Sequence, residues 1–242
     1  MRNISLVLML AMLFLCACER EHSKNVELAV KTGSLVKGVV VTEGAMVITY
    51  SYEYDGADNL DKVTVSYSNS SEVQEYAYTK KGPSEMEIVD QIYTHTLDLN
   101  GTGCIERYTL MYDSDIASVI EFVYSGAQVK NVIMGDDVAL DYEWNGDDIS
   151  SIGNKRSNIC HEYRYSEIVD NFNVSIPQLT YIYGTPFAFF TKLGASSRHL
   201  ESSSSHFIDE ASSHRTLSYE RNSSGDIFLI KSTDGRSWEI LY

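Results

Sequence analysis

Aromatic and aliphatic residues alternate with polar ones along most of the chain, at the period of two typical of a half-buried β-strand. In residues 142–152, two aromatic residues stand two positions apart, Asn-Gly follows, and aliphatic residues occur five and eight positions after the second aromatic. Residues 122–132 repeat this spacing with Ser-Gly as the turn pair. Asn-Gly between alternating segments is a strong hairpin signal, because glycine accepts the positive φ of a tight turn. Each unit therefore predicts a strand, a two-residue turn and a second strand.

The same unit recurs elsewhere with small changes. Residues 52–63 carry it with one residue inserted after Asp55-Gly56, which is a second strong turn signal. Looser copies begin at three further positions: Tyr76, Tyr163 and Tyr219. Because successive hairpins pair edge to edge, we predict a single, mainly all-β domain over residues 36–242, an antiparallel meander of hairpin repeats that forms a twisted or curled sheet.

Residues 177–215 interrupt the meander with an aromatic cluster, a glycine and a serine-rich run, and we expect an irregular insertion there. Phe187, Phe190 and Leu193 fall near helical spacing, which predicts one short helix near residues 187–200. Such a helix would cover apolar side chains that a single-layer sheet leaves in water. The alternative is a ligand-gripping loop, since long irregular insertions often carry function.

The N-terminal segment has a different pattern. Arg2 precedes an apolar run that is short for a bilayer span, which needs about 20 residues. The run ends in Leu15-Cys16-Ala17-Cys18, with a small residue directly before the last cysteine. This resembles the lipobox of bacterial lipoproteins, which implies a signal peptide over residues 1–17 and lipid attachment to Cys18. The alternatives are a plain secretory signal or a transmembrane anchor.

Residues 18–35 are polar and mixed, and we interpret them as the lipid-anchored tether. Glu19 and Glu21 directly follow the lipobox and resemble the surface-export signal of Bacteroidetes lipoproteins. The resemblance implies attachment to the outer membrane through the N-terminal lipid, either on its periplasmic face or at the cell surface.

Composition restricts the partners further. The chain carries 34 acidic residues against 19 Lys and Arg, a formal net charge of −15, which disfavours nucleic acid as a partner. Two cysteines lie in the predicted domain, Cys104 and Cys160. In an oxidising envelope a disulfide between them is one outcome and two separate buried thiols are the other. The Cys and His spacings do not match a metal site, and we expect neither a metal nor a cofactor.

Candidate catalytic residues are sparse. His199, His206 and His214 fall in the interruption beside many serines, but the GxSxG signature of a nucleophile elbow does not occur. We therefore expect a non-enzymatic protein, with a hydrolase as the second alternative. The acid pair Asp147-Asp148 follows Gly146, where Asp favours turns, and calcium binding is the alternative there.

The alternating aromatic residues are the candidate ligand contacts. Exposed Tyr and Trp rings offer flat faces on which sugar rings stack, whereas buried ones would be cross-strand packing pairs. We consider four of these aromatic residues as possible ligand contacts: Tyr142, Trp144, Tyr181 and Tyr183.

The stretch Tyr-x-Tyr-Asp-Gly-x-x-Asn-Leu-x-x-Val at 52–63 is similar to the tyrosine–aspartate repeats of Rhs and teneurin surface proteins. With the lipobox and a Leu-Gly-x-Ser-Ser-x-x-Leu element at 193–200, the chain resembles an uncharacterised family of Bacteroidetes lipoproteins. The resemblance implies no particular activity. We expect a lipid-anchored envelope protein with a binding or structural role, its ligand a glycan or a partner protein. A lipid or lipoprotein carrier, with a cavity in the curled sheet, is the alternative.

Overall fold

Short strands of alternating apolar and polar residues, joined by tight turns, build the domain. The computed structural model describes residues 34–154, 157–177, 197–208 and 211–242. The strands in chain order are β1 (Gly38–Glu43), β2 (Met46–Tyr54), β3 (Leu60–Tyr67), β4 (Val73–Gly82), β5 (Glu85–Val89), β6 (Tyr93–Leu99), β7 (Ile105–Tyr112), β8 (Asp115–Ser125), β9 (Gln128–Met134), β10 (Asp137–Asn145), β11 (Asp148–Asn154), β12 (Ile159–Val169), β13 (His199–Ile208), β14 (Ala211–Arg221), β15 (Ile227–Ser232) and β16 (Arg236–Leu241).

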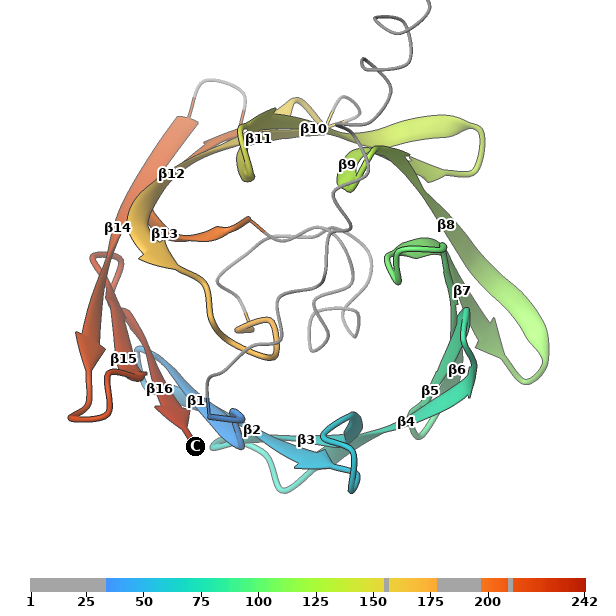
Figure 1. The fold of residues 1–242 in the computed structure, drawn as a ribbon, viewed down its shortest axis with the longest axis horizontal. Coiled ribbons are helices and arrows are strands. Elements are labelled where there is room, and N and C mark those ends of the chain that lie inside the picture. The colour runs from blue at the N-terminus through green and yellow to red at the C-terminus, as the bar shows by residue number, and fades with distance from the viewer. Residues whose placement is uncertain (1–33, 155–156, 178–196, 209–210) are drawn as a thin grey trace, which may run out of the picture. The chain divides into compact units, whose positions relative to one another are not determined.

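Each strand pairs antiparallel with its chain neighbours, and β1 also pairs with β16, which closes the sheet (Figure 1). At the closure Val39 lies opposite Ile240, and on its other side it lies opposite Tyr50. The described residues thus form a closed barrel of sixteen strands. The predicted all-β antiparallel meander is confirmed, but the prediction of a twisted or curled sheet is corrected, because the sheet closes into a barrel. Closure pairs the backbone groups that the two edges of an open sheet would leave without partners.

Two of the predicted hairpins have the expected turns. The pairs 125–128 and 145–148 enclose two-residue turns, in which Gly126 has a φ of 65° and Gly146 a φ of 63°. This is the left-handed region that glycine enters without steric cost. The repeat spacing therefore predicted the positive φ of both glycines, whereas the turn residues, Gly126-Ala127 and Gly146-Asp147, begin one position later than the predicted pairs.

The turn after β2 differs from the prediction. The inserted residue makes it longer, and the positive φ of 61° falls on Asp58 and not on Gly56. The Asp55 carboxylate accepts hydrogen bonds from the backbone nitrogens of Ala57 and Asn59, at 2.8 and 2.9 Å. The side chain of Asp55 therefore stabilises a loop that the Asp-Gly signal alone would have made a two-residue turn.

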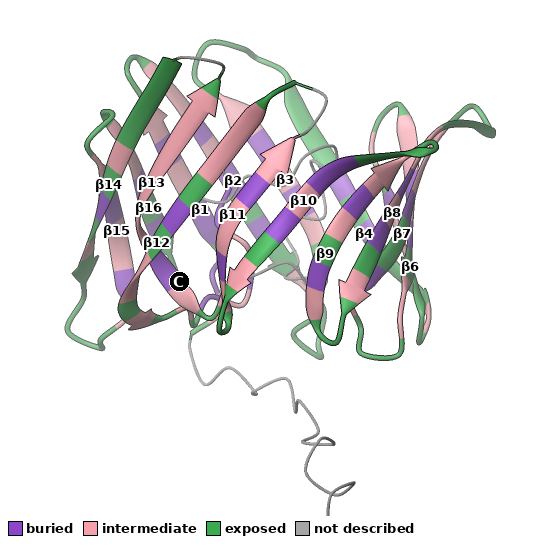
Figure 2. Cartoon of the chain, turned by 90° about the horizontal axis from the view of Figure 1, so that it is seen from above, coloured by how far each residue is buried: buried purple, intermediate pink, exposed green. Residues whose placement is uncertain are grey.

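The buried residues lie on one face of the strands. Along β2, Ile48, Tyr50 and Tyr52 are buried, whereas Ser51 and Glu53 between and beyond them are exposed. Figure 2 shows the same alternation on neighbouring strands. Residues directly opposite each other in an antiparallel ladder share a face of the sheet. The pairing register therefore continues this buried face from strand to strand around the barrel.

Residues 170–177 show that the buried face points inward. They follow β12 and turn into the interior of the barrel (Figure 1). The indole Nε1 of Trp238 donates to the carbonyl of Pro177 at 2.8 Å, and the Asn173 amide donates to the Tyr54 hydroxyl at 2.8 Å. The segment packs three buried apolar side chains against this wall: Phe172, Val174 and Ile176.

The outer face of the barrel is largely polar. Ion pairs join outward residues of adjacent strands, at 2.6–2.7 Å: Lys62 with Glu53, Arg107 with Glu121, and Lys231 with Glu220. Exposed apolar residues, among them Val89 and Val123, also lie on this face. An apolar interior with a charged exterior is the reverse of a transmembrane barrel, whose apolar side chains face lipid.

The predictions for residues 177–215 require correction. The helix expected near 187–200 falls mostly on residues 178–196, which lie outside the described residues, but its end is wrong, because His199 and Leu200 begin β13. The irregular insertion is also wrong from residue 199 onward, since β13 and the start of β14 occupy it. Pairing with β12 and β14 gives the serine-rich run two complete ladders, which outweigh the loop preference of serine.

The described residues contain no helix long and apolar enough to cross a membrane.

Candidate functional site

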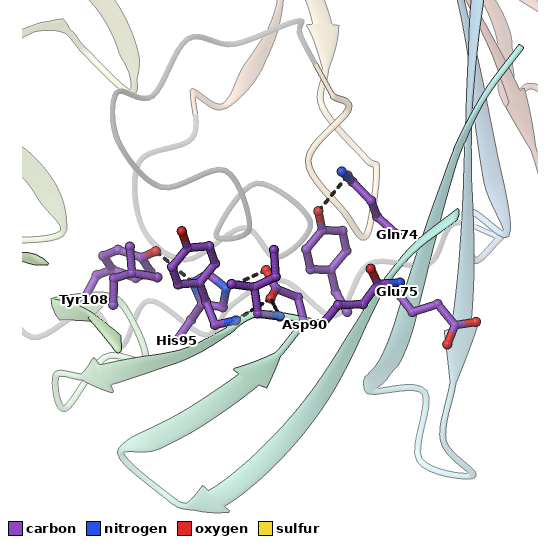
Figure 3. A pocket seen from close by; sticks show the side chains of 10 residues that line it. Gln74, Glu75, Asp90, His95 and Tyr108 are labelled. Carbon is purple, nitrogen blue, oxygen red and sulfur yellow. Dashed lines mark hydrogen bonds and ion pairs between the residues drawn. The ribbon is translucent and has the colours of Figure 1, made fainter. Parts of the chain in front are cut away.

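A cavity of about 390 Å³ opens at one end of the barrel, where β4 and β6 begin and β7 ends (Figure 3). It lies beside the turn between β5 and β6, and its walls come from three strands, β4, β6 and β7, and from this turn. The residues that line it are Gln74, Glu75, Tyr76, Asp90, Gln91, Ile92, Tyr93, His95, Tyr108 and Leu110. Its volume is within the range of small-molecule sites.

Asp90, His95 and Tyr108 form a hydrogen-bonded chain along this cavity. The Oδ2 atom of Asp90 lies 3.2 Å from His95 Nε2, and His95 Nδ1 lies 2.8 Å from the Tyr108 hydroxyl. Because an ionised carboxylate only accepts, His95 carries its proton on Nε2, and Nδ1 accepts from the Tyr108 hydroxyl. The chain fixes the Tyr108 hydroxyl as a donor to His95 and leaves its oxygen able to accept from a ligand.

The turn between β5 and β6 positions this chain. The Oδ1 atom of Asp90 accepts from the backbone nitrogens of Ile92 and Tyr93, at 2.7 and 2.6 Å. An aspartate that binds its own turn in this way is a common turn former, so the local sequence orients the carboxylate. His95 follows on the inward face of β6 and is only 1% exposed.

The pKa values set the charges of the site. Burial raises the pKa of Asp90, but the hydrogen bonds from Tyr93, Ile92 and His95 outweigh it, so that the pKa is lowered. Burial lowers the pKa of His95, and the opposing effect of Asp90 does not cancel this. Burial, and then Asp90, raises the pKa of Tyr108. At neutral pH the chain therefore consists of a carboxylate, a neutral imidazole and a protonated phenol.

Aromatic rings extend from the cavity onto the rim of the barrel. The rings of Tyr93 and His95 have centroids 6.3 Å apart, and Tyr93 and Tyr112 have centroids 5.8 Å apart. Ile92 and Tyr112 are 60% and 56% exposed. Inside, the Tyr76 hydroxyl donates to Gln74 Oε1 at 3.0 Å. The site is thus an aromatic surface that continues from a buried wall to an exposed edge.

A second polar group lies on the inner face of β12, β13 and β14. The guanidinium of Arg215 pairs with the carboxylate of Glu201, and the Arg215 Nε atom also donates to Ser204 Oγ at 2.9 Å. The Nδ1 atoms of His161 and His206 lie 2.9 Å apart. The described residues contain no group of three or more His, Cys, Asp or Glu that could hold a metal.

Two of the four predicted aromatic ligand contacts, Tyr142 and Trp144, do not line the cavity. Tyr142 is buried in the core at 5% exposure, and the Trp144 indole donates to the carbonyl of Val129 at 2.7 Å. On β11, Ile152 lies opposite Tyr142 and Ile149 lies opposite Trp144, so both aromatic residues face inward and pack as the cross-strand pairs that were the alternative. Tyr181 and Tyr183 lie outside the described residues, as does Cys18.

Cys104 and Cys160 are both free, partly exposed thiols, so the disulfide, one of the two outcomes considered, is not formed. Cys104 lies just before β7 and Cys160 lies in β12, and β7 and β12 are on opposite sides of the barrel (Figure 1). Four strands, β8 to β11, lie between β7 and β12 in the sheet, and this separates the two residues.

The three histidines of the interruption do not converge on one site. His199 Nδ1 lies 2.8 Å from Asp148 Oδ2, and the backbone nitrogen of His199 donates to Asp148 Oδ1 at 2.8 Å. His206 contacts His161 inside the barrel, and His214 lies 3.1 Å from Ser205 Oγ at an exposed position. The acid pair that was predicted to form a turn thus also fixes the start of β13.

Sequence reasoning missed the residues of the cavity. One available signal was His95, which occupies the apolar phase of the alternating segment Tyr93-x-His95-x-Leu97. A titratable group at an inward position requires polar partners, and Asp90 in the preceding turn is one of them. Tyr108 comes from the next strand, and the pairing of His95 with Leu110 brings it near.

No family model and no curated protein matches the chain. Solved structures are similar to it. A porin-like protein from Bacteroides uniformis superposes with a TM-score of 0.64 at 12% identity, covering 85% of this chain and 96% of that one. A porin-like protein from Bacteroides vulgatus gives a TM-score of 0.51 at 12% identity, covering 87% and 99%. At this identity the likeness shows that the chain shares the barrel fold of these proteins.

Proposed function

We propose that the chain is a non-enzymatic binding protein of the cell envelope, held at the outer membrane by lipid on Cys18. Its barrel is surrounded by water and binds a small ligand in the cavity between β4 and β7. The observation that carries this proposal is the orientation of the barrel wall, apolar and aromatic within and charged outside.

The outer wall argues for a lipid tether and against a wall embedded in the bilayer. Arg107 on β7 and Glu121 on β8 pair on the outside of the barrel, and both are about half exposed. A Lys or Arg facing lipid at the bilayer midplane costs roughly 2–4 kcal/mol. The wall repeats such pairs on β2–β3 and β14–β15, so the cost would recur around the barrel.

A pore is the function that the name of the neighbouring structures suggests. It is disfavoured for this chain by the same wall, and by residues 170–177, which lie within the barrel against Trp238 and Tyr54. A carrier of acyl chains also loses support, since these residues cover apolar wall that a lipid would need. The cavity between β4 and β7 lies at the other end of the strands from residues 34–37, which enter β1.

Two measurements test the proposal. Growth with an alkyne fatty acid should label the wild type and leave Cys18→Ser unlabelled. A chain in which a cleavable secretory signal replaces residues 1–18 should then partition into the aqueous phase of a detergent phase separation, whereas the wild type enters the detergent phase. If the chain without the lipobox still enters the detergent phase with native circular dichroism, the wall itself binds lipid and the proposal fails.

A further inference from the structure

We propose that the cavity between β4 and β7 binds an organic cation, an ammonium group with apolar substituents. This inference rests on the proposed binding function and names the class of ligand. Three independent observations carry it: the aromatic walls, the internal pairing of the polar groups, and the charge of the site.

The walls offer tyrosine rings from three strands. Tyr76 comes from β4, Tyr93 from β6 and Tyr108 from β7, and all three line the same cavity. A cation is attracted to the negative face of an aromatic ring, and the attraction grows where water is displaced. Tyr76 and Tyr108 are buried, at 6% and 2% exposure, so their rings are removed from competing water.

Six polar side chains of the site, Gln74, Tyr76, Asp90, Gln91, His95 and Tyr108, are already hydrogen-bonded to protein groups. Gln74 Oε1 accepts from Tyr76, and Gln91 Nε2 donates to the carbonyl of Val73 at 3.0 Å. Asp90, His95 and Tyr108 are hydrogen-bonded to one another, as described above. A sugar exchanges many hydroxyl hydrogen bonds with water for bonds to protein, and it needs a matching set of available donors and acceptors. The cavity provides ring surface in place of such a set.

The charge of the site is negative. Asp90 is ionised, and none of the ten described lining residues is Lys or Arg. Its partner His95 is buried and neutral, so hydrogen bonding to it leaves the carboxylate charge in place. The Glu75 carboxylate points away from this group (Figure 3), which leaves the Asp90 carboxylate as the negative charge beside the rings. A single negative charge beside desolvated rings favours a cation over a neutral or anionic ligand.

The test compares choline with its uncharged isostere 3,3-dimethylbutan-1-ol and with methyl β-glucoside. Each is titrated by calorimetry into the full-length lipoprotein in a polyoxyethylene detergent, which carries neither charge nor sugar. We expect choline to bind at least about tenfold more tightly than the isostere. Asp90→Asn should abolish this preference, because Asn preserves the shape of the side chain and an acceptor for the turn.

A matched control and a second variant separate charge from folding. Asp98→Asn removes the same charge from an exposed position on the outer face of β6, and it should leave all three titrations unchanged. Tyr93→Leu, at the half-buried rim, should weaken choline binding several-fold more than binding of the isostere. The Tyr93 variant therefore tests the cation assignment even if Asp90→Asn fails to fold.

The outcomes distinguish the two proposals. Equal affinity for choline and its isostere, or tighter binding of the glucoside, would overturn the cation assignment and leave the binding function standing. Binding of none of the three probes to the wild type would overturn both, since the cavity would then hold no small molecule of any tested class.

Discussion

Arg215 on β14 and Glu201 on β13 form a bidentate ion pair on the inner side of the barrel wall, with two nitrogen–oxygen distances of 3.1 Å. The side chains are only 13% and 8% exposed. The Tyr219 hydroxyl donates to the carbonyl of Glu201, which fixes the backbone of this residue as well. Burial has removed most of the water around each charge. Each charge therefore depends on its close contact with the other for stabilisation.

Removing one member of the pair should therefore destabilise the barrel. Arg215→Met leaves the Glu201 carboxylate buried without its cation, and we expect the free energy of unfolding to fall by about 3–5 kcal/mol. Urea unfolding at neutral pH measures this change. The double variant with Glu201→Gln should recover part of the loss, because the uncompensated charge is gone.

The exposed pair of Lys231 and Glu220 is the matched control for this prediction. It joins β14 to β15 at 2.6 Å, with side chains 55% and 47% exposed. Lys231→Met should change the free energy of unfolding by less than about 1 kcal/mol. Similar losses for the Lys231 and Arg215 variants would show that burial does not determine the contribution of these pairs.

The histidine pair predicts a pH dependence of stability. Burial, and then the nearby His206 and Arg215, lowers the pKa of His161 to about 4, whereas an unfolded chain has a value of about 6.5. As the pH falls below 6.5, the unfolded chain takes up a proton first. The stability that neutral His161 contributes is therefore present above about pH 6.5 and is lost as the pH falls toward 4.

The variant His161→Phe isolates this contribution, because it keeps a ring beside Tyr163, with which His161 is stacked. Unfolding curves recorded from pH 7 to pH 4 should show a shallower decline for the variant than for the wild type. A difference between the two proteins that stays constant over this range would contradict the assignment of the low pKa to His161.

The sequence supports the strands and turns better than it supports the site. The spacing around Gly126 and Gly146 predicted two hairpins, because the constraint is local: an alternating pattern and one left-handed residue. Closure of the barrel depends on the pairing of β1 with β16, which are almost 200 residues apart, and no local signal encodes it. The cavity could not be predicted for the same reason, since Tyr76, His95 and Tyr108 come from different strands, each with the sequence pattern of an ordinary meander unit.

The two glycine turns should respond differently to substitution. Gly146 has a φ of 63°, which a residue with a Cβ adopts at a cost, whereas Gly56 has no positive φ and open space around it. Gly146→Val should lower the free energy of unfolding by about 1–3 kcal/mol. Gly56→Ala should be close to neutral, because it meets neither strain nor a neighbouring atom. Thermal unfolding measures both, and equal melting temperatures would contradict the turn assignment.

The turn between β10 and β11 places two neighbouring carboxylates in different structural roles. Asp148 accepts hydrogen bonds from the backbone nitrogen and the ring Nδ1 of His199, both at 2.8 Å, and its side chain is 17% exposed. Asp147 pairs with Arg198 at 3.1 Å, with side chains 65% and 61% exposed. The backbone bond from Arg198 to the Asp147 carbonyl does not depend on the Asp147 side chain.

Asp148→Ala should therefore be the more damaging of two adjacent substitutions. It removes both acceptors of His199 and releases the start of β13 from the turn, and leaving such donors without partners costs about 1–3 kcal/mol. Asp147→Ala removes an exposed ion pair and should cost less than about 1 kcal/mol. Urea unfolding of the two variants at neutral pH provides the comparison. A loss at Asp147 as large as that at Asp148 would mean that both carboxylates act as turn formers, as their sequence position alone suggested.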